Sequence, residues 1–290
     1  MRLVRFAIPT DTSLFTPLQL QPRCMFWLGM SAWARWLQEH LVSFRHLIRD
    51  HRLGFVVLSA HLEYLQPFGF FDADELVVEA GFRARMGGVV LQGDYNYIGG
   101  GKKVAEARCI LRPVRLQDLH SLAAVPSRLS PSLLDRFQPD EVDRERPERV
   151  VPELVRELEK GQALAEASSP LMIHRHDCEV ADQWSFIEVP SHVGAARERL
   201  ALEHAGDSRA LSSALSNPLR SIDAELNRPM YLLDQGTTST KAYSNGGEVG
   251  FIHRLYTGVQ EHAVVVERFV TSAIGGEGWG GTALPSPDVD

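Results

Sequence analysis

The sequence predicts an α+β fold made of two related halves, each with one long helix and an antiparallel sheet. Residues 63–67 (EYLQP) and Asp72 recur as residues 225–229 (ELNRP) and Asp234, at a constant offset of 162 (225 minus 63). Residues 90–112 also resemble residues 250–270, at an offset of 160 (250 minus 90). A period this long indicates a duplicated domain rather than a solenoid repeat.

In the first half, expected at residues 1–115, residues 25–49 have the apolar spacing of a helix with one broad apolar face. Four β-rich runs follow, at residues 55–63, 70–85, 89–98 and 103–114, and glycine pairs or triplets separate the later ones as hairpin turns do. The apolar face of the helix is formed by Trp33, Trp36, Leu37, Leu41, Phe44, Leu47 and Ile48.

A linker is expected at residues 116–170, because proline, acidic residues and arginine dominate residues 127–147. Residues 152–167 have the pattern of an amphipathic helix. A connection of this length is compatible with a compact protein when it contains its own helices.

The second half is expected at residues 171–274, and residues 275–290 are expected to be a disordered tail. A strand is predicted at residues 171–180 and a helix at residues 189–203. Further strands are predicted at residues 222–226, 231–244, 248–257 and 262–270.

The composition is that of an ordinary soluble protein. The 290 residues are 44% apolar and 23% charged, and the mean hydropathy is −0.14. The net charge of −7 argues against nucleic acid or an anionic membrane as the main partner. No signal peptide or apolar run of membrane-spanning length is present in this sequence. We therefore expect a cytoplasmic protein, with monomer and homodimer both left open.

The segment 175–182 (RHDCEVAD), leading to Ser191 and a helix at residues 193–199 (VGAARER), resembles the acyl-CoA thioesterases of the 4-hydroxybenzoyl-CoA type. In those enzymes the first strand ends in two acidic positions, and the central helix begins shortly afterwards. The resemblance implies a double hot-dog fold, in which each sheet wraps around its own helix. It also places Asp182 on the catalytic aspartate and Glu179 on the other acidic position.

The chain departs from that family pattern in three respects. Residues 183–188 (QWSFIE) replace the usual glycine and histidine or asparagine. Aligning Arg35 with Arg197 puts Leu20 where a second aspartate would fall in the first half. Neither half has the His-x-x-x-Gly-x-x-x-x-Pro pattern of a double hot-dog dehydratase. One competent site rather than two is implied, and dehydration is disfavoured.

Thioester hydrolysis needs a nucleophile or base and a group that stabilises the oxyanion. The carboxylate of Asp182 could attack the thioester or take a proton from water, and Glu179 could raise its pKa. Backbone N–H groups near Glu188 and Val189, at the helix N-terminus, could hold the oxyanion. The alternative for Asp182 is a helix cap or a turn residue, and the alternative for Glu179 is an exposed strand-end charge.

Lys102 and Lys103 form a dense basic turn, and Arg112 follows on the next strand together with Arg108 and Arg115. Clustered cations suit the phosphates of coenzyme A or of a phosphopantetheine arm. The alternative is a hairpin kept soluble by its lysines.

No metal site or separate cofactor is predicted. His174 and His176 could chelate zinc with Asp177 or Asp182, but no third ligand is fixed by the spacing. The cysteines Cys24, Cys109 and Cys178 are expected to be reduced thiols. The repeated residues Glu63, Glu225, Asp72 and Asp234 are expected to serve turns or strand edges.

Three functions follow from these observations. The first is hydrolysis of an acyl-CoA or acyl-carrier-protein thioester. The second is acyl transfer, with or without decarboxylation, on carrier proteins in polyketide-type biosynthesis. The third is acyl binding without catalysis, which the apolar Leu20 and the atypical loop at residues 183–188 keep open.

Overall fold

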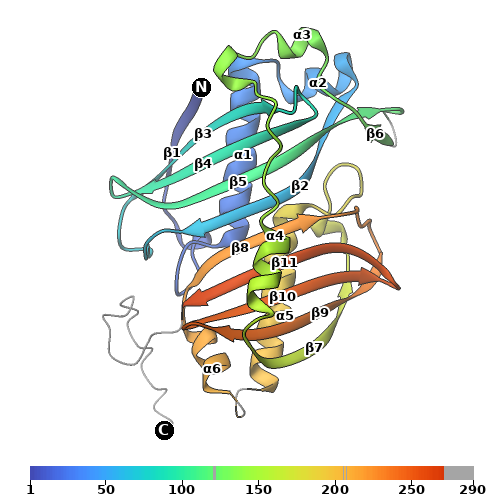
Figure 1. Cartoon of the computed structure of the whole chain (residues 1–290). Helices are drawn as coiled ribbons and strands as arrows, with labels where there is room; N and C mark the ends of the chain where they lie inside the picture. The colour runs from blue at the N-terminus through green and yellow to red at the C-terminus, as the bar shows by residue number, and fades with distance from the viewer. Residues whose placement is uncertain (120–121, 205, 207, 271–290) are drawn as a thin grey trace.

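The computed structural model describes residues 1–119, 122–204, 206 and 208–270. One antiparallel sheet runs through the molecule in the order β1-β3-β4-β5-β2-β8-β11-β10-β9-β7. The first five strands in this order come from the N-terminal half of the chain and the last five from the C-terminal half (Figure 1). They are β1 (Leu3–Pro9), β2 (Leu53–Tyr64), β3 (Glu75–Arg85), β4 (Val90–Gly99), β5 (Lys102–Leu116), β7 (Gln162–Met172), β8 (Leu219–Leu226), β9 (Gln235–Asn245), β10 (Glu248–Thr257) and β11 (Gln260–Val270).

The two halves join where β2 pairs with β8, and the register of this pairing follows the repeat in the sequence. His61 lies opposite Asp223, and the offset of 162 relates these same two residues (223 minus 61). Ser59 lies opposite Glu225, and Glu63 lies opposite Ser221. The repeated segments are therefore paired symmetrically about His61 and Asp223.

The β4–β5 and β10–β11 hairpins are also equivalent in place, but they are 158 residues apart (258 minus 100) and not the predicted 160. Their two-residue turns begin at Gly100 and Gly258, with φ angles of 56° and 58°. Glycine adopts this left-handed conformation without the steric cost of a Cβ atom.

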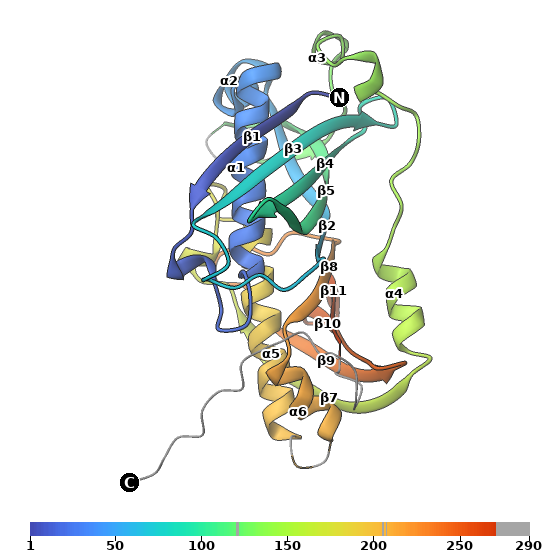
Figure 2. The same ribbon diagram turned by 90° about the vertical axis from the view of Figure 1, so that its left-hand side faces the viewer.

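The central helices α1 (Pro22–His40) and α5 (Val189–Glu203) lie end to end on one face of the sheet, with their N-termini toward each other (Figure 2). The prediction of one helix at residues 25–49 was wrong. The chain breaks at residues 41–43 and begins a second helix, α2 (Phe44–His51), where Ser43 accepts a hydrogen bond from the His46 N–H. Trp33 and Trp36 are buried and stacked in the core, whereas Trp27 is exposed.

Helix α5 has the bounds that its apolar spacing predicted. Helix α6 (Arg209–Ser216) was not predicted, because its serine-rich sequence shows no clear period. Only Leu211 and Ala214 of α6 are buried, so the apolar face of this helix is short.

The linker lies over the opposite face of the sheet, where α4 (Val151–Leu158) covers β9, β10 and β11 (Figure 2). Val151, Val155 and Leu158 pack there in a second, smaller core, and each such burial contributes roughly 1.5–3 kcal/mol. The linker also contains β6 (Ala124–Pro126), α3 (Pro131–Leu134) and the 3-10 turn η2 (Pro139–Glu141).

Three predicted boundaries in and after the linker were wrong. The helix ends at Leu158 rather than at residue 167, and β7 already begins at Gln162, so the second half starts before residue 171. Strand β7 is a largely exposed edge rich in alanine and serine, which a helical pattern fits equally well. The strand predicted at residues 171–180 ends at Met172. The predicted tail at residues 275–290 lies outside the described residues, as do residues 271–274.

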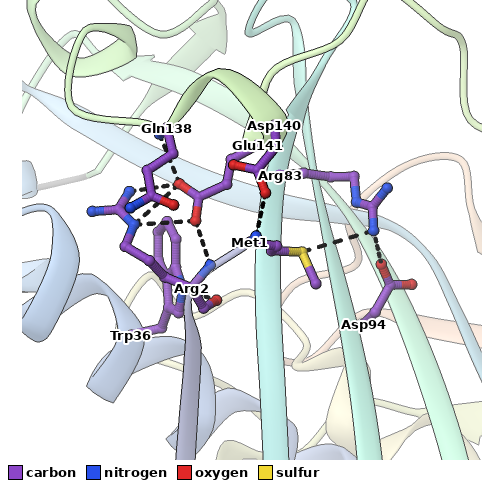
Figure 3. A network of polar contacts seen from close by, with 8 residues as sticks. All are labelled: Met1, Arg2, Trp36, Arg83, Asp94, Gln138, Asp140 and Glu141. Atoms are coloured by element: carbon purple, nitrogen blue, oxygen red, sulfur yellow. Dashed lines mark hydrogen bonds and ion pairs between the residues drawn. The ribbon is translucent and has the colours of Figure 1, made fainter.

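The N-terminal strand is tied to the linker by a network of polar contacts (Figure 3). Arg2 forms an ion pair of 2.6 Å with Glu141, whose side chain is fully buried, and the terminal amine contacts Asp140. The hydrogen bonds and charge of Arg2, with a backbone hydrogen bond from Gln138, outweigh the effect of burial and lower the pKa of Glu141 to about 2. The network therefore fixes the middle of the linker to the N-terminal end of β1.

No helix among the described residues is long and apolar enough to cross a membrane.

Candidate active site

The N-terminal ends of the two central helices meet at the seam between the halves. Arg23 of α1 donates two hydrogen bonds to Glu188, which precedes α5, at 2.6 Å and 2.8 Å. The rings of Phe26 and Phe186 pack beside this ion pair at 5.6 Å. The two side chains differ in exposure, since that of Arg23 is 50% exposed and that of Glu188 is 12% exposed.

A buried carboxylate lies next to this seam. After β7 the chain forms the 3-10 turn η3 (Arg175–Asp177), and the Asp177 side chain is only 6% exposed. Its Oδ2 accepts a hydrogen bond of 2.8 Å from the His174 N–H. Burial of a carboxylate is costly unless it is hydrogen-bonded or paired, so Asp177 needs its neighbours.

A histidine from the first turn of α5 approaches the other oxygen of Asp177. Nε2 of His192 lies 3.3 Å from Oδ1, and the His192 side chain is 21% exposed. The ring of Trp184 packs edge-on against it at 5.5 Å. His176 approaches the same Oδ1 at 3.5 Å but is 81% exposed. A partly accessible histidine therefore contacts a buried carboxylate at a helix N-terminus.

The first half has no counterpart of this carboxylate. The carbonyl of Asp177 accepts a hydrogen bond of 2.9 Å from Ser185 N–H, and the carbonyl of Leu14 accepts one of 2.8 Å from Gln21 N–H. These matching bonds make Leu14 the structural counterpart of Asp177. Leu20, which the sequence placed opposite Asp182, forms a bridge with Phe15 that matches the bridge between Cys178 and Trp184.

The histidine is also replaced in the first half. The offset of 164 between Gln21 and Ser185 (185 minus 21) puts Leu28 in the place of His192, and Leu28 is buried in the core. Both polar groups are therefore leucine in the N-terminal half, so among the described residues the N-terminus of α1 has no carboxylate–histidine pair like that of α5.

Asp182, on which the family resemblance placed the catalytic carboxylate, lies in solvent. Its side chain is 65% exposed and its nearest charged partner is the exposed Arg175, at 3.6 Å. Its φ angle is 52°, a left-handed conformation that aspartate tolerates in turns. These features match the alternative role of Asp182 as a turn residue.

Glu179 lies in the same turn, where its carbonyl accepts the Asp182 N–H at 3.0 Å. The residue is exposed at the surface, but surrounding protein atoms still desolvate the carboxyl group and raise its pKa. Desolvation, and not a neighbouring carboxylate, is the cause of this shift.

The N–H groups predicted to hold an oxyanion already have acceptors. Glu188 N–H donates to Ser185 O at 3.0 Å, and Val189 N–H donates to Phe186 O. Pro190 has no N–H group. Ser191 is the next residue of this first turn that has an N–H group. The side chain of Glu188 serves instead to bind Arg23.

The predicted phosphate-binding cations do not form one cluster. Lys102 and Arg112 are ten residues apart on β5, which separates them by roughly 33 Å in an extended strand. Lys102 and Lys103 are exposed at the β4–β5 turn, and Lys103 contacts Glu106. Arg112 lies further along β5, on the face that the linker covers.

The remaining predicted residues have structural surroundings. The rings of His174 and His176 stack at 5.5 Å, and no group of His, Cys, Asp and Glu suited to a metal occurs within the described ranges. Cys178 is half-buried with a raised pKa, first because of desolvation and then because of nearby carboxylates, which disfavours the thiolate.

The repeated acidic residues have matching structural roles in the two halves. Asp72 accepts a hydrogen bond from Gly69 N–H and Asp234 accepts one from Tyr231 N–H, each three residues back. Glu63 pairs with Arg220 at 2.9 Å, and Glu225 pairs with Arg149. The predicted turn role is confirmed for Asp72 and Asp234, whereas Glu63 and Glu225 lie within strands that are paired on both sides.

Sequence analysis missed the pairing of Asp177 with His192 and of Arg23 with Glu188. Asp177 was considered only as a metal ligand. One signal was present: Asp177 is followed fifteen residues later (192 minus 177) by a histidine in the first turn of a predicted helix. No local spacing links Arg23 to Glu188, which are 165 residues apart.

Central helices that meet tip to tip across one continuous antiparallel sheet define the class of hot-dog proteins that the 175–182 segment resembles. One solved structure of similar fold is a protein provisionally described as an oleoyl thioesterase from Lactobacillus plantarum. It has a TM-score of 0.71 and 10% identity, over 93% of this chain and 95% of its own. An acyl-ACP thioesterase from Bacteroides thetaiotaomicron has a TM-score of 0.63 and 11% identity, over 92% of this chain and 97% of its own.

The 12:0-ACP thioesterase from Umbellularia californica is similar to the same degree, with a TM-score of 0.63 and 11% identity over 92% of this chain and 93% of its own. No protein-family model matches the chain, and no curated protein matches its sequence. At these identities the likeness establishes the fold, which is that of structures described as thioesterases.

Proposed function

We propose that the protein is an acyl-thioester hydrolase whose single site lies at the seam, with Asp177 and His192 as its central residues. The observation that supports this most is the buried carboxylate of Asp177, 3.3 Å from a partly exposed histidine at the N-terminus of the central helix. We also propose that the two halves are copies of one hot-dog unit, of which only the second kept its polar site residues.

The proposed chemistry assigns one role to each group. The Asp177 carboxylate takes a proton from water while the water oxygen attacks the thioester carbonyl, and the carbon–sulfur bond then breaks to release the thiol. In the second route the carboxylate attacks the carbonyl directly, the thiolate leaves, and water hydrolyses the resulting mixed anhydride to the free acid. His192 orients the carboxylate through Oδ1 and exchanges a proton with the reacting water or the leaving thiol. The Ser191 N–H stabilises the oxyanion, a contribution typically of about 3 kcal/mol. These steps need no cofactor beyond the coenzyme A or phosphopantetheine of the substrate.

The substrate class follows from the same proposal. Acyl-CoA and acyl-carrier-protein thioesters present the same reacting group, and the exposed Lys102 and Lys103 remain the proposed contacts for their phosphates. The acyl group itself is left to a substrate panel.

Substitution of Asp177 tests the proposal against the assignment from sequence. Asp177→Asn should lower the release of free thiol from an acyl-CoA and acyl-carrier-protein panel by roughly a hundredfold or more, the scale of a lost general base. Asp182→Asn, five residues away in the same loop, should keep the wild-type rate. The reverse result would return the catalytic role to Asp182.

The same assay distinguishes hydrolysis from the two alternative functions. Mass spectrometry should find the acyl group as free acid even when a second thiol is supplied. Acyl groups on the added thiol would instead identify a transferase. Binding of acyl-CoA without turnover would identify a binding protein.

A further inference from the structure

A groove of about 710 Å³ lies on the face of the sheet opposite the central helices. Its floor is formed by β2, β3, β4, β5 and β8, and the linker residues 145–151 form one wall. Figure 1 shows this linker crossing in front of the sheet while α1 lies behind it. Neighbouring residues of β2 separate the two faces, since His61 lines the groove whereas Leu62 belongs to the main core. The groove is therefore distinct from the Asp177 site.

Arginine dominates the charge of this groove, and four of the six lining arginines have anionic partners. Arg85 pairs with Asp143, Arg149 with Glu225, and both Arg83 and Arg108 with Asp94. The lining arginines are Arg83, Arg85, Arg108, Arg112, Arg146 and Arg149, and the lining carboxylates are Glu145, Glu148, Asp223 and Glu225.

Arg112 and Arg146 differ from the others, because neither forms a hydrogen bond or ion pair with any described residue. Arg112 is half-buried, and its buried Nε has no hydrogen-bond partner in the described part of the chain. A guanidinium that is partly removed from water and left unpaired is costly. This cost would be offset by an anion that enters the groove.

His61 supplies a further polar group in the groove, at the level of Arg108 and thus four strand residues from Arg112. Its Nδ1 lies 2.5 Å from Oδ1 of the buried Asp223, so Nε2 is the ring nitrogen left for a ligand. Burial and the charge of Arg268 would lower the pKa of His61. The hydrogen bond and charge of Asp223, together with the charge of Glu63, outweigh them, so the pKa of His61 is raised. Arg108 lies directly opposite His61 on β5.

We propose that this groove binds a small phosphate monoester, with Arg112 and Arg146 holding the phosphate and His61 contacting the organic part. A phosphate carries about −1.5 to −2 charges and three acceptor oxygens, and planar guanidinium groups match its geometry. The volume lies within the usual range for small-molecule sites, about 300–1,000 Å³. His61 lies opposite Arg108, which is four residues from Arg112, roughly 13 Å along the strand. One phosphate group therefore cannot contact both Arg112 and His61.

Calorimetric titration of the full chain tests this proposal, in the absence of any thioester, with adenosine 5′-monophosphate, ribose 5-phosphate and inorganic phosphate. At least one ester should bind more tightly than inorganic phosphate, and acetate should bind more weakly than all three. Arg112→Gln should weaken ester binding about tenfold or more, as expected for a lost charge-assisted hydrogen bond. Arg115→Gln, an exposed arginine three residues along the same strand, should bind the ester like the wild type.

Two further variants separate binding from folding. Arg146→Gln changes an exposed linker residue, so it should weaken the ester without changing the thermal unfolding midpoint. His61→Asn keeps a donor toward Asp223 but removes Nε2, so it should weaken the ester and leave inorganic phosphate unaffected. No binding by either ester, equal binding of acetate, or wild-type affinity in Arg112→Gln would overturn the proposal. None of these outcomes depends on the proposed hydrolase activity.

Discussion

Asp177 and His192 are fifteen residues apart (192 minus 177), and their contact depends on how the chain turns between them. Trp184 N–H donates to Met230 O and Ser185 N–H donates to Asp177 O, at 2.8 Å and 2.9 Å, which folds residues 178–185 back over the start of α5. The result is a buried carboxylate whose two oxygens have different partners. At the scale of single residues, burial separates Asp177 from the chemically identical Asp182 in the same loop.

A double-mutant cycle tests whether the two site residues act as a unit. His192→Gln should lower kcat by about a hundredfold or more. The double variant with Asp177→Asn should be hardly slower than Asp177→Asn alone, because residues that act together are not additive. Additive losses in steady-state kinetics on the same thioester would show that His192 acts apart from Asp177.

The two central helices have equivalent places but different surroundings. The helix α1 packs Trp33 and Trp36 against Phe82, whereas α5 places Arg197 over a buried polar network. Arg197 pairs with Glu267 at 2.6 Å, and Glu267 lies 3.2 Å from His253. The helix that positions His192 is thus held to its sheet by a buried ion pair.

Removal of the charge of Glu267 should weaken this attachment. Glu267→Gln leaves the largely buried Arg197 with only the exposed Glu198 as a counter-charge, so the free energy of unfolding should fall by about 3 kcal/mol. Glu203→Gln is the matched control, because Glu203 pairs with Arg199 on the exposed side of the same helix and should change stability by less than 1 kcal/mol. Denaturant titration measures both, and equal losses would contradict a special role for the buried pair.

The same variant gives a prediction for pH. Burial alone would raise the pKa of Glu267, but Arg197 and His253 outweigh it and the pKa is lowered below 4.5. A carboxylate with a lowered folded-state pKa stabilises the fold above its unfolded-state pKa and loses this contribution as the pH falls through the folded value. Below pH 4.5 the stability of the wild type should therefore fall more steeply than that of Glu267→Gln. Parallel curves would exclude Glu267 as a source of the acid sensitivity.

At the scale of the whole molecule, the halves are held together by more than the linker. The β2–β8 pairing makes the sheet continuous, and Arg23 and Glu188 join the tips of the central helices. The linker is fixed at two points, by Arg2 and Glu141 near its middle and by the apolar face of α4 near its end.

Cleavage of the linker should consequently leave the molecule assembled. A protease site inserted between the exposed Glu145 and Arg146 would separate the chain into two fragments, each with its own central helix and five-stranded part of the sheet. After cleavage the fragments should co-elute with the uncut protein in size-exclusion chromatography at micromolar concentration. Two separate peaks would mean that the linker itself holds the halves together.

The sequence by itself determined the elements and their duplication. The bounds of α5 and β10 follow from apolar periodicity, and the segments around Glu63 and Glu225 mark the strands that meet at the seam. These features are local, since side-chain spacing and turn residues act over a few positions. The break after α1 was missed because Leu41 and Phe44 continue the apolar spacing of a helix. The early start of β7 was missed because its alanine- and serine-rich sequence fits more than one structure.

Only the tertiary structure decided which acidic residue is buried and what it contacts. Asp177 and Asp182 have the same side chain, so residue type does not distinguish them. Solvent exposure does, because burial makes the Asp177 carboxylate dependent on its partners. The meeting of Arg23 with Glu188, and of His61 with Asp223, joins residues more than 160 positions apart. Such contacts form where the two halves of the chain meet, and a single sequence contains no local signal for them.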